Sequence, residues 1–182
     1  AGRLTLNPID HVDPMGALVF LISVLAGVGF GWAKPVPINP LYFRNPRRDT
    51  IIVSIAGVAA NFALLLATMF LIKFLIVLGF FQIAGNSLQA TGDLSHWVYR
   101  ILVWFMLFNG VLMVFNLLPI PPLDGSKVLM MILPGKQAQS IAALEPYGFF
   151  IIILLLFTGV IPRVIGFAAD IIYTVAGFVF FL

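Results

Sequence analysis

Residues 116–125 read Asn-Leu-Leu-Pro-Ile-Pro-Pro-Leu-Asp-Gly, which places three prolines and an aspartate at the end of an apolar run. Proline ends a helix because it lacks a backbone N–H and its ring clashes with the preceding turn. In hydrocarbon every backbone polar group needs an internal partner, so irregular chain at membrane depth must be packed in protein or line a wet cavity. An ionisable residue there is a functional hypothesis by default. The stretch therefore predicts a broken helix with a site at Asp124.

The composition of the whole chain indicates a membrane protein. Hydrophobic residues make up 62% of the 182 residues and charged residues 9%, against roughly 25% charged in soluble domains. A helical span needs about 20 apolar residues, so this length holds one domain of four or five spans. A scattered net charge of +3 gives little support to nucleic-acid binding. We predict an all-α polytopic integral membrane protein, surrounded by a lipid bilayer.

Hydropathy places the predicted spans along the chain. They are residues 15–32, residues 51–72 with an apolar continuation to residue 81, residues 98–118, residues 147–160 continuing to Ile165, and residues 166–182 as a candidate fifth. Pro162 and Arg163 are predicted to separate the last two spans, and residues 85–95 to form a polar turn. Lys73, near the end of the second span, is expected to extend its ammonium group to the membrane surface.

Two basic clusters predict the orientation. Arg44, Arg47 and Arg48 precede the second span, and Lys127 and Lys136 follow the third. Two spans separate the clusters, so both return to the same face, which the positive-inside rule makes cytoplasmic. We expect a multi-pass protein of the cell membrane with the Asp124 site toward the cytoplasm.

A proline-rich linker precedes the first basic cluster. Residues 34–40 read Lys-Pro-Val-Pro-Ile-Asn-Pro, and prolines at this spacing push the residues before them into extended conformations. The linker is predicted to form an extended segment at the membrane face. Such a segment either pairs with an unwound peptide by strand addition or serves as a rigid connector.

Several motifs together resemble one family. Residues 116–125 are similar to the Asn-x-x-Pro-x-x-x-Leu-Asp-Gly signature of site-2 proteases, which are intramembrane zinc metalloproteases. Residues 31–37 (Gly-Trp-Ala-Lys-Pro-Val-Pro) and residues 2–16 also resemble segments of that family, in the same order. Residues 56–61 (Ala-Gly-Val-Ala-Ala-Asn) resemble Ala-Gly-Pro-x-x-Asn, with Val58 where proline is usual.

The resemblance implies a zinc site that this chain does not complete. It makes Asp124 the third zinc ligand and gives Asn61 and Asn116 a role in substrate binding. The other two ligands and the general-base glutamate belong to a His-Glu-x-x-His helix. The two histidines here, His11 and His96, lie in no such motif. We therefore expect the zinc ligands and base to lie upstream of Ala1, no catalytic residue in this chain, and residues 1–182 to be a single transmembrane protease-like domain truncated at its N-terminus.

Each candidate residue also has a structural interpretation. Asp124 is a natural helix cap, and Asn61 and Asn116 can hydrogen-bond between helices. His11, between Asp10 and Asp13, belongs either to a metal site or to a structured turn flanked by Asn7-Pro8 and Asp13-Pro14. His96, beside Trp97, is expected at the membrane interface.

The function predicted from these residues is hydrolysis of peptide bonds in or near the transmembrane helices of substrate proteins, close to the cytoplasmic side. The break at residues 119–122 and the polar positions around Gly57 and Asn61 are expected to admit water. A transporter or channel with a broken-helix site is one alternative, in which Asp124, Asn116 and Asn61 line a solute path. A catalytically inactive membrane scaffold is the other. Nothing in the sequence indicates an oligomeric state.

Overall fold

The computed structural model describes residues 7–25, 43–84 and 87–181, in two units that divide between Phe43 and Arg44. The first unit contains the 3-10 helix η1 (Pro8–His11) and helix α1 (Pro14–Leu25). Asn7 Oδ1 accepts the Ile9 N–H at 3.2 Å, and Asp13 Oδ1 accepts the Gly16 N–H at 2.9 Å. These bonds form a structured turn around His11, which is one of the two alternatives left open by the sequence. The rest of the first predicted span and the proline-rich linker lie outside the described residues.

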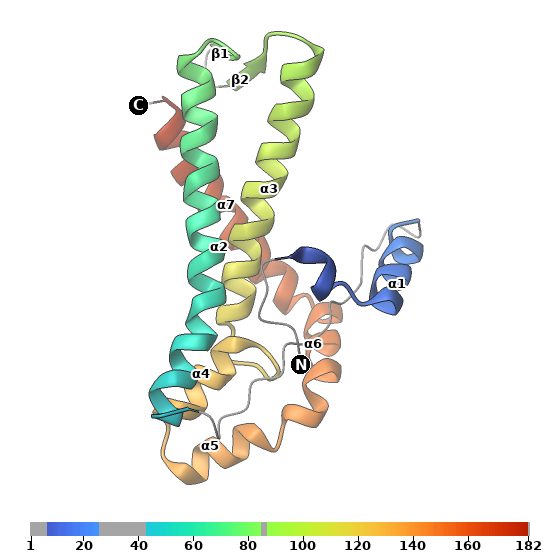
Figure 1. Cartoon of the computed structure of the whole chain (residues 1–182), viewed down its shortest axis with the longest axis vertical. Coiled ribbons are helices and arrows are strands. Elements are labelled where there is room, and N and C mark those ends of the chain that lie inside the picture. Colours follow the sequence, from blue (N-terminus) through green and yellow to red (C-terminus); the bar gives the residue numbers. More distant parts are fainter. Residues whose placement is uncertain (1–6, 26–42, 85–86, 182) are drawn as a thin grey trace. The chain divides into compact units, whose positions relative to one another are not determined.

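The second unit is helical apart from one hairpin (Figure 1). Its elements are α2 (Pro46–Val77), β1 (Phe81–Ala84), β2 (Ser87–Ala90), α3 (Asp93–Leu117), α4 (Asp124–Ile132), α5 (Gly135–Ala142), η3 (Glu145–Tyr147), α6 (Gly148–Phe157) and α7 (Val160–Phe181). Four segments of the described chain are long and apolar enough to span a membrane: α2, α3, residues 135–157 and α7. The predicted all-α polytopic architecture is confirmed.

Helix α2 begins at an N-cap asparagine followed by proline. Asn45 precedes Pro46, and its Oδ1 accepts the Arg48 N–H at 3.3 Å, while Asp49 accepts the Asn45 N–H at 3.1 Å. Proline suits the first helical position, where its missing N–H would have no partner anyway. The helix then continues through Val58 without a break. At about 1.5 Å per residue its 32 residues exceed the roughly 30 Å hydrocarbon core, so α2 must tilt or project from the membrane.

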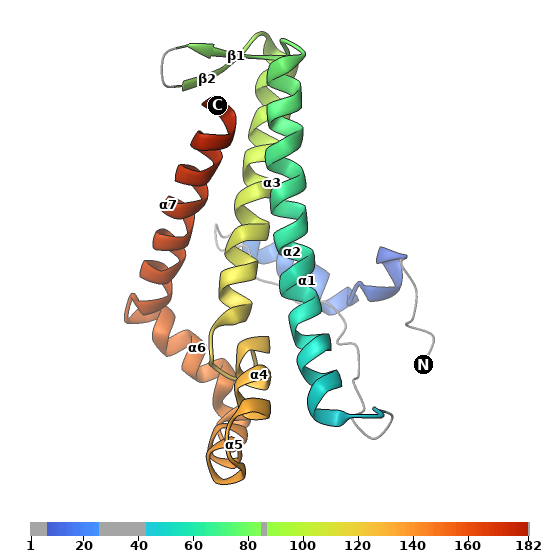
Figure 2. The ribbon, with the colours of Figure 1, turned by 90° about the vertical axis from the view of Figure 1, so that its left-hand side faces the viewer.

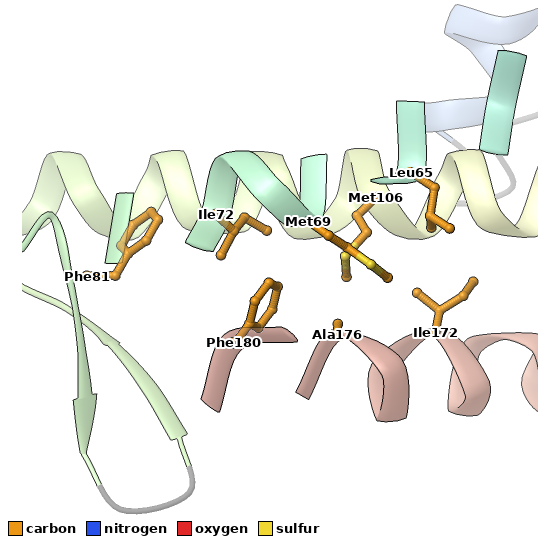
Figure 3. Packing of buried hydrophobic residues seen from close by; sticks show 8 residues of the cluster. All are labelled: Leu65, Met69, Ile72, Phe81, Met106, Ile172, Ala176 and Phe180. Atoms are coloured by element: carbon orange, nitrogen blue, oxygen red, sulfur yellow. The ribbon is translucent and has the colours of Figure 1, made fainter. Parts of the chain in front are cut away.

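The core lies where α2, α3 and α7 pack together. Its buried residues are Leu65, Met69 and Ile72 of α2, Phe81 of β1, Met106 of α3, and Ile172, Ala176 and Phe180 of α7. Figure 3 shows the α7 side chains pointing toward those of α2 and α3. Many other large apolar side chains are exposed, as expected for helices that face lipid.

The hairpin corrects two expectations. The apolar continuation over residues 74–81 is helical only as far as Val77, where α2 ends, and Gly79 then adopts a positive φ of 75°, the conformation that commonly ends helices. Residues 85–95 are not only a turn, because β1 and β2 pair antiparallel with Phe81 opposite Ala90. Phe81 is buried against the helices and contacts the Tyr99 ring edge-on at 5.5 Å. This aromatic anchor ties the hairpin to α3.

The boundary between the last two helices also differs from the expectation. Pro162 and Arg163 lie in the first turn of α7, and the break falls at Thr158 and Gly159. Gly159 has a φ of 78°, so it ends α6 as a glycine C-cap does. Proline is tolerated in a first helical turn because its missing N–H costs no intrahelical bond there.

Side-chain hydrogen bonds to helix ends join elements at both ends of the second unit. Lys73 Nζ donates to the Phe180 carbonyl at 3.2 Å, so Lys73 bonds the last turn of α7 and does not simply extend to the surface as predicted. Arg47 donates to the Met131 and Ile132 carbonyls at the end of α4. Figure 2 shows the hairpin at one end of the unit and α4 and α5 at the other.

Candidate functional site

The proline break separates α3 from α4 as predicted. Helix α3 ends at Leu117, and α4 begins at Asp124. Within the break the Leu123 N–H donates to the Ile120 carbonyl at 2.9 Å, and the Ser126 N–H donates to the Leu123 carbonyl at 3.1 Å. The buried Ser126 hydroxyl donates to the same Leu123 carbonyl at 2.7 Å. Local turns therefore satisfy much of the irregular backbone.

Two glycines make the break compact. A Cβ on Gly125 would lie 2.2 Å from the Leu117 carbonyl oxygen, so the first turn of α4 packs on the last turn of α3 backbone to backbone. A Cβ on Gly148, at the start of α6, would lie 2.3 Å from the Pro121 carbonyl oxygen. The surrounding atoms are main chain and cannot rotate away. The glycine that follows Asp124 is thus required by packing.

Asp124 is the first residue of α4, not its cap. The N-cap position is Leu123, and no side chain caps this helix. Asp124 Oδ1 instead accepts a hydrogen bond from Lys127 Nζ at 2.9 Å, with the Asp124 side chain 29% exposed. A carboxylate in the first turn still interacts favourably with the helix dipole. The expected capping bond is therefore replaced by an ion pair one turn along the helix.

The other carboxylate oxygen faces α2. A Cβ built on Gly57 would lie 3.8 Å from Asp124 Oδ2, so this oxygen lies close to α2 at a position without a side chain. Gly57 belongs to the motif at residues 56–61, far from Asp124 in sequence. The structure therefore brings two of the predicted motifs together.

Asn61 and Asn116 both belong to helices that pack against α4. Asn61 is half-buried and lies four residues after Gly57, on the same face of α2. Asn116 is half-buried in the last turn of α3, just before the break. His11 and His96 lie in η1 and at the start of α3, and His96 is exposed beside Trp97 with their rings 6.1 Å apart.

Comparison with known proteins identifies the family. The family model described as "Peptidase family M50" matches residues 35–157, about two thirds of the chain. This chain belongs to peptidase family M50. The matched range includes residues 35–40 of the proline-rich linker, the motif at residues 56–61 and the break with Asp124, so the resemblance to site-2 proteases is confirmed.

Two curated relatives of the M50 chain carry matching names. "Putative zinc metalloprotease YwhC" of Bacillus subtilis is 37% identical over 157 residues, which cover 86% of this chain and 66% of the relative. "Putative zinc metalloprotease Rip2" of Mycolicibacterium smegmatis is 34% identical over 168 residues, covering 89% of this chain and 56% of the relative. The chain thus spans less than two thirds of the length of either relative. No solved structure gave a significant match.

A zinc site needs more donors than the described part of this M50 chain provides. Zinc in hydrolytic sites takes three protein ligands, commonly histidine and carboxylate, and one water. No group of three His, Cys, Asp or Glu side chains gathers anywhere in residues 7–25, 43–84 and 87–181. Asp124 offers a carboxylate as one suitable ligand, and the Lys127 ammonium group bonds one of its two oxygens. The described residues therefore do not form a three-ligand zinc site by themselves.

The sequence analysis named Lys127 and Gly57 without predicting their proximity to Asp124, and it did not consider Asn109. Lys127 stands three residues after Asp124, a spacing that places opposite charges together on a helix, and this signal was available. Asn109 is buried in α3 and donates to the Phe105 carbonyl at 2.8 Å. The proximity of Gly57 to Asp124 could not be predicted, because it depends on how α2 and α4 pack.

Proposed function

We propose that this chain is part of an intramembrane zinc metalloprotease of the site-2 type, which hydrolyses peptide bonds in or near transmembrane helices of other proteins. The approach of Asp124 Oδ2 to Gly57 carries the proposal. It places a carboxylate of the Leu-Asp-Gly motif against the one stretch of α2 that also resembles the family. A structural ion pair alone would not require a bare helix surface beside the second oxygen.

Asp124 is the zinc ligand in this proposal, and the remaining ligands and the general base come from residues outside the described part of the chain. Bound zinc would supply an activated water and would polarise the peptide carbonyl. Lys127 bonds Oδ1, so Oδ2, the oxygen that faces Gly57, is the one that would bind the metal. Asn61 and Asn116 orient the substrate backbone through their amides.

The test compares Asp124→Asn with Asp49→Asn in the whole protein. Both aspartates are half-buried and lie in the first turn of a helix, but only Asp124 approaches Gly57. Asp124→Asn removes the negative charge that a zinc ligand needs. We expect it to abolish cleavage of a model transmembrane substrate and to lower zinc content measured by metal analysis. Asp49→Asn should retain both. Normal zinc content and near wild-type cleavage in Asp124→Asn would refute the ligand assignment.

The proposed substrate-binding roles of Asn61 and Asn116 are tested by measuring zinc content and turnover separately in alanine variants. Asn116→Ala removes an amide but no charge, so zinc content should stay at the wild-type level. Loss of one orienting hydrogen bond to the reacting carbonyl costs roughly a hundredfold in turnover. Unchanged turnover in both Asn61→Ala and Asn116→Ala would leave these amides with interhelical roles only.

The proposed orientation puts the α4 end of the second unit in the cytoplasm. Arg47, at the start of α2, contacts the end of α4, so both basic clusters belong to that end. Because the chain has no cysteine, Gln82→Cys in β1 and Gln139→Cys in α5 are matched reporters, both at exposed positions. In intact cells a membrane-impermeant thiol reagent should label position 82 and not position 139. The reverse pattern would overturn the orientation.

A further inference from the structure

A polar hollow lies between β2 and the first turns of α3. It has a volume of about 720 Å³, and its lining includes Gln89 of β2 with Asp93, His96 and Arg100 of α3. Asp124 follows the opposite end of α3, which at about 1.5 Å per residue is about 37 Å long. The hollow is therefore separate from the site proposed for proteolysis.

The hollow offers hydrogen-bond donors to an anion. His96 and Arg100 are four residues apart, so their side chains share one face of α3. Both are exposed. Lys127 with Asp124 forms the one ion pair among the described side chains, so the Arg100 guanidinium has no carboxylate bound to it there. Asp93, the acid of this lining, is the first residue of α3, two helical turns before Arg100.

An apolar groove continues from the same arginine along α3. It has a volume of about 400 Å³ and is lined by Trp97, Arg100, Ile101, Trp104, Phe105 and Phe108. The Trp104 and Phe108 rings lie 5.8 Å apart, and Trp104 is 56% exposed. From Trp97 to Phe108 the groove covers about 16 Å of helix, roughly the depth of one bilayer leaflet.

Arg100 joins the two hollows. It lines both, and its guanidinium lies 5.6 Å from the centre of the Trp97 ring. An arginine two turns inside a candidate span is costly in hydrocarbon unless its head group reaches polar surroundings. Guanidinium groups bind phosphate oxygens in pairs, and tryptophans favour the level of lipid head groups. The arrangement matches a molecule with an anionic head and an apolar tail.

We propose that this surface binds an anionic phospholipid, with the phosphate at Arg100 and His96 and one acyl chain in the groove from Trp97 to Phe108. A free phosphate would use the polar hollow without the groove. A partner transmembrane helix would use the groove without needing the anion. Only a lipid occupies both.

The test measures lipid binding to the purified 182-residue chain by native mass spectrometry in detergent. The probes are dioleoyl phosphatidylglycerol, dioleoyl phosphatidylcholine and inorganic phosphate. We expect phosphatidylglycerol to bind about tenfold more tightly than phosphatidylcholine. The choline group of phosphatidylcholine carries a positive charge that compensates its phosphate, and phosphatidylglycerol has no such charge. Arg100→Gln should remove this preference, since it deletes the charge-assisted hydrogen bonds to phosphate. Arg163→Gln, at another exposed arginine, should preserve it.

The groove is tested separately with Trp104→Ala. This variant should weaken binding of dioleoyl phosphatidylglycerol several-fold and leave the preference for the anionic head group intact. Circular dichroism confirms that each variant retains its helices. Equal binding of the two lipids, equal effects of Arg100→Gln and Arg163→Gln, or no effect of Trp104→Ala would overturn the proposal. So would displacement of the lipid by equimolar inorganic phosphate.

Discussion

The two ends of α3 are built in opposite ways. At the C-terminal end, Gly125 and Gly148 meet main-chain carbonyls so closely that neither has room for a Cβ. At the N-terminal end, Gly92 has no atom within 4 Å of the position that its Cβ would take, and a hollow of about 720 Å³ opens beside the helix. One end is held by contacts between backbones, and the other by side-chain hydrogen bonds.

The two ends of α3 differ in packing because they support different parts of the molecule. Asp124 is carried by the compact end, where main-chain packing leaves little freedom to the first turn of α4. A metal ligand, the role we propose for Asp124, needs such rigid support. At the open end Thr91 Oγ1 donates to the Phe80 carbonyl at 3.0 Å, and the Gly92 N–H donates to Ser95 Oγ at 2.8 Å. These bonds fix the hairpin while leaving the adjacent surface accessible to a ligand.

The largest expected effect comes from filling the compact end. Gly125→Ala places a methyl group against the Leu117 and Leu118 carbonyls, and main-chain atoms cannot move without displacing α3 or α4. We expect the free energy of unfolding in detergent to fall by about 3 kcal/mol. Gly135→Ala, at the start of α5, has open space and is the control, expected to be neutral or slightly stabilising. Equal stability of the two variants would show that the break is not tightly packed.

A smaller loss is expected where a glycine meets side chains instead of backbone. A Cβ on Gly110 would lie 2.2 Å from Ile172 Cδ1 and 3.0 Å from Leu65 Cδ1, and both groups can rotate. Alanine also favours the helix by up to about 1 kcal/mol over glycine. Gly110→Ala should therefore cost about 1.5 kcal/mol in the same unfolding measurement. A cost above that of Gly125→Ala would mean that the core between α3 and α7 is the less tolerant region.

The open end is tested by removing its hydrogen bonds. Ser95→Ala deletes the hydroxyl that accepts the Gly92 N–H, and loss of a comparable bond at a helix start costs about 1 kcal/mol. Ser140→Ala in α5 is the control, because that hydroxyl is exposed and bonds a carbonyl within its own helix. Its effect should be a few tenths of a kcal/mol. Identical values for the two variants would argue against a specific role of Ser95 in anchoring the hairpin.

The smallest effect is expected for the ion pair at the compact end. Lys127 is 36% exposed and Asp124 29% exposed, so solvent screens their attraction. A double-mutant cycle of Lys127→Gln and Asp124→Asn should give a coupling energy of about 0.5 kcal/mol in unfolding. A coupling above about 2 kcal/mol would make the pair a structural element and weaken the case for a functional carboxylate.

Local patterns in the chain predicted the helices better than their ends. Apolar length revealed α2 and α3, and the prolines of residues 119–122 correctly marked the end of α3. The hairpin was missed because Phe80 and Phe81 extend the apolar run beyond Gly79, whose positive φ ends the helix. The break before α7 was misplaced because proline is a stop signal only inside a helix, and Pro162 lies in the first turn.

The sequence by itself determined the membrane class and the broken helix, because apolar length and proline chemistry act locally. Membership of the M50 family also follows from the sequence, because the family's motifs occur in it in the expected order and spacing. Only the tertiary structure decided that Asp124 faces Gly57, that Lys73 bonds the end of α7, and that Arg100 lines two hollows at once. Most of these contacts join residues distant in the chain, so they depend on how α2, α3, α4 and α7 pack, which no local pattern encodes.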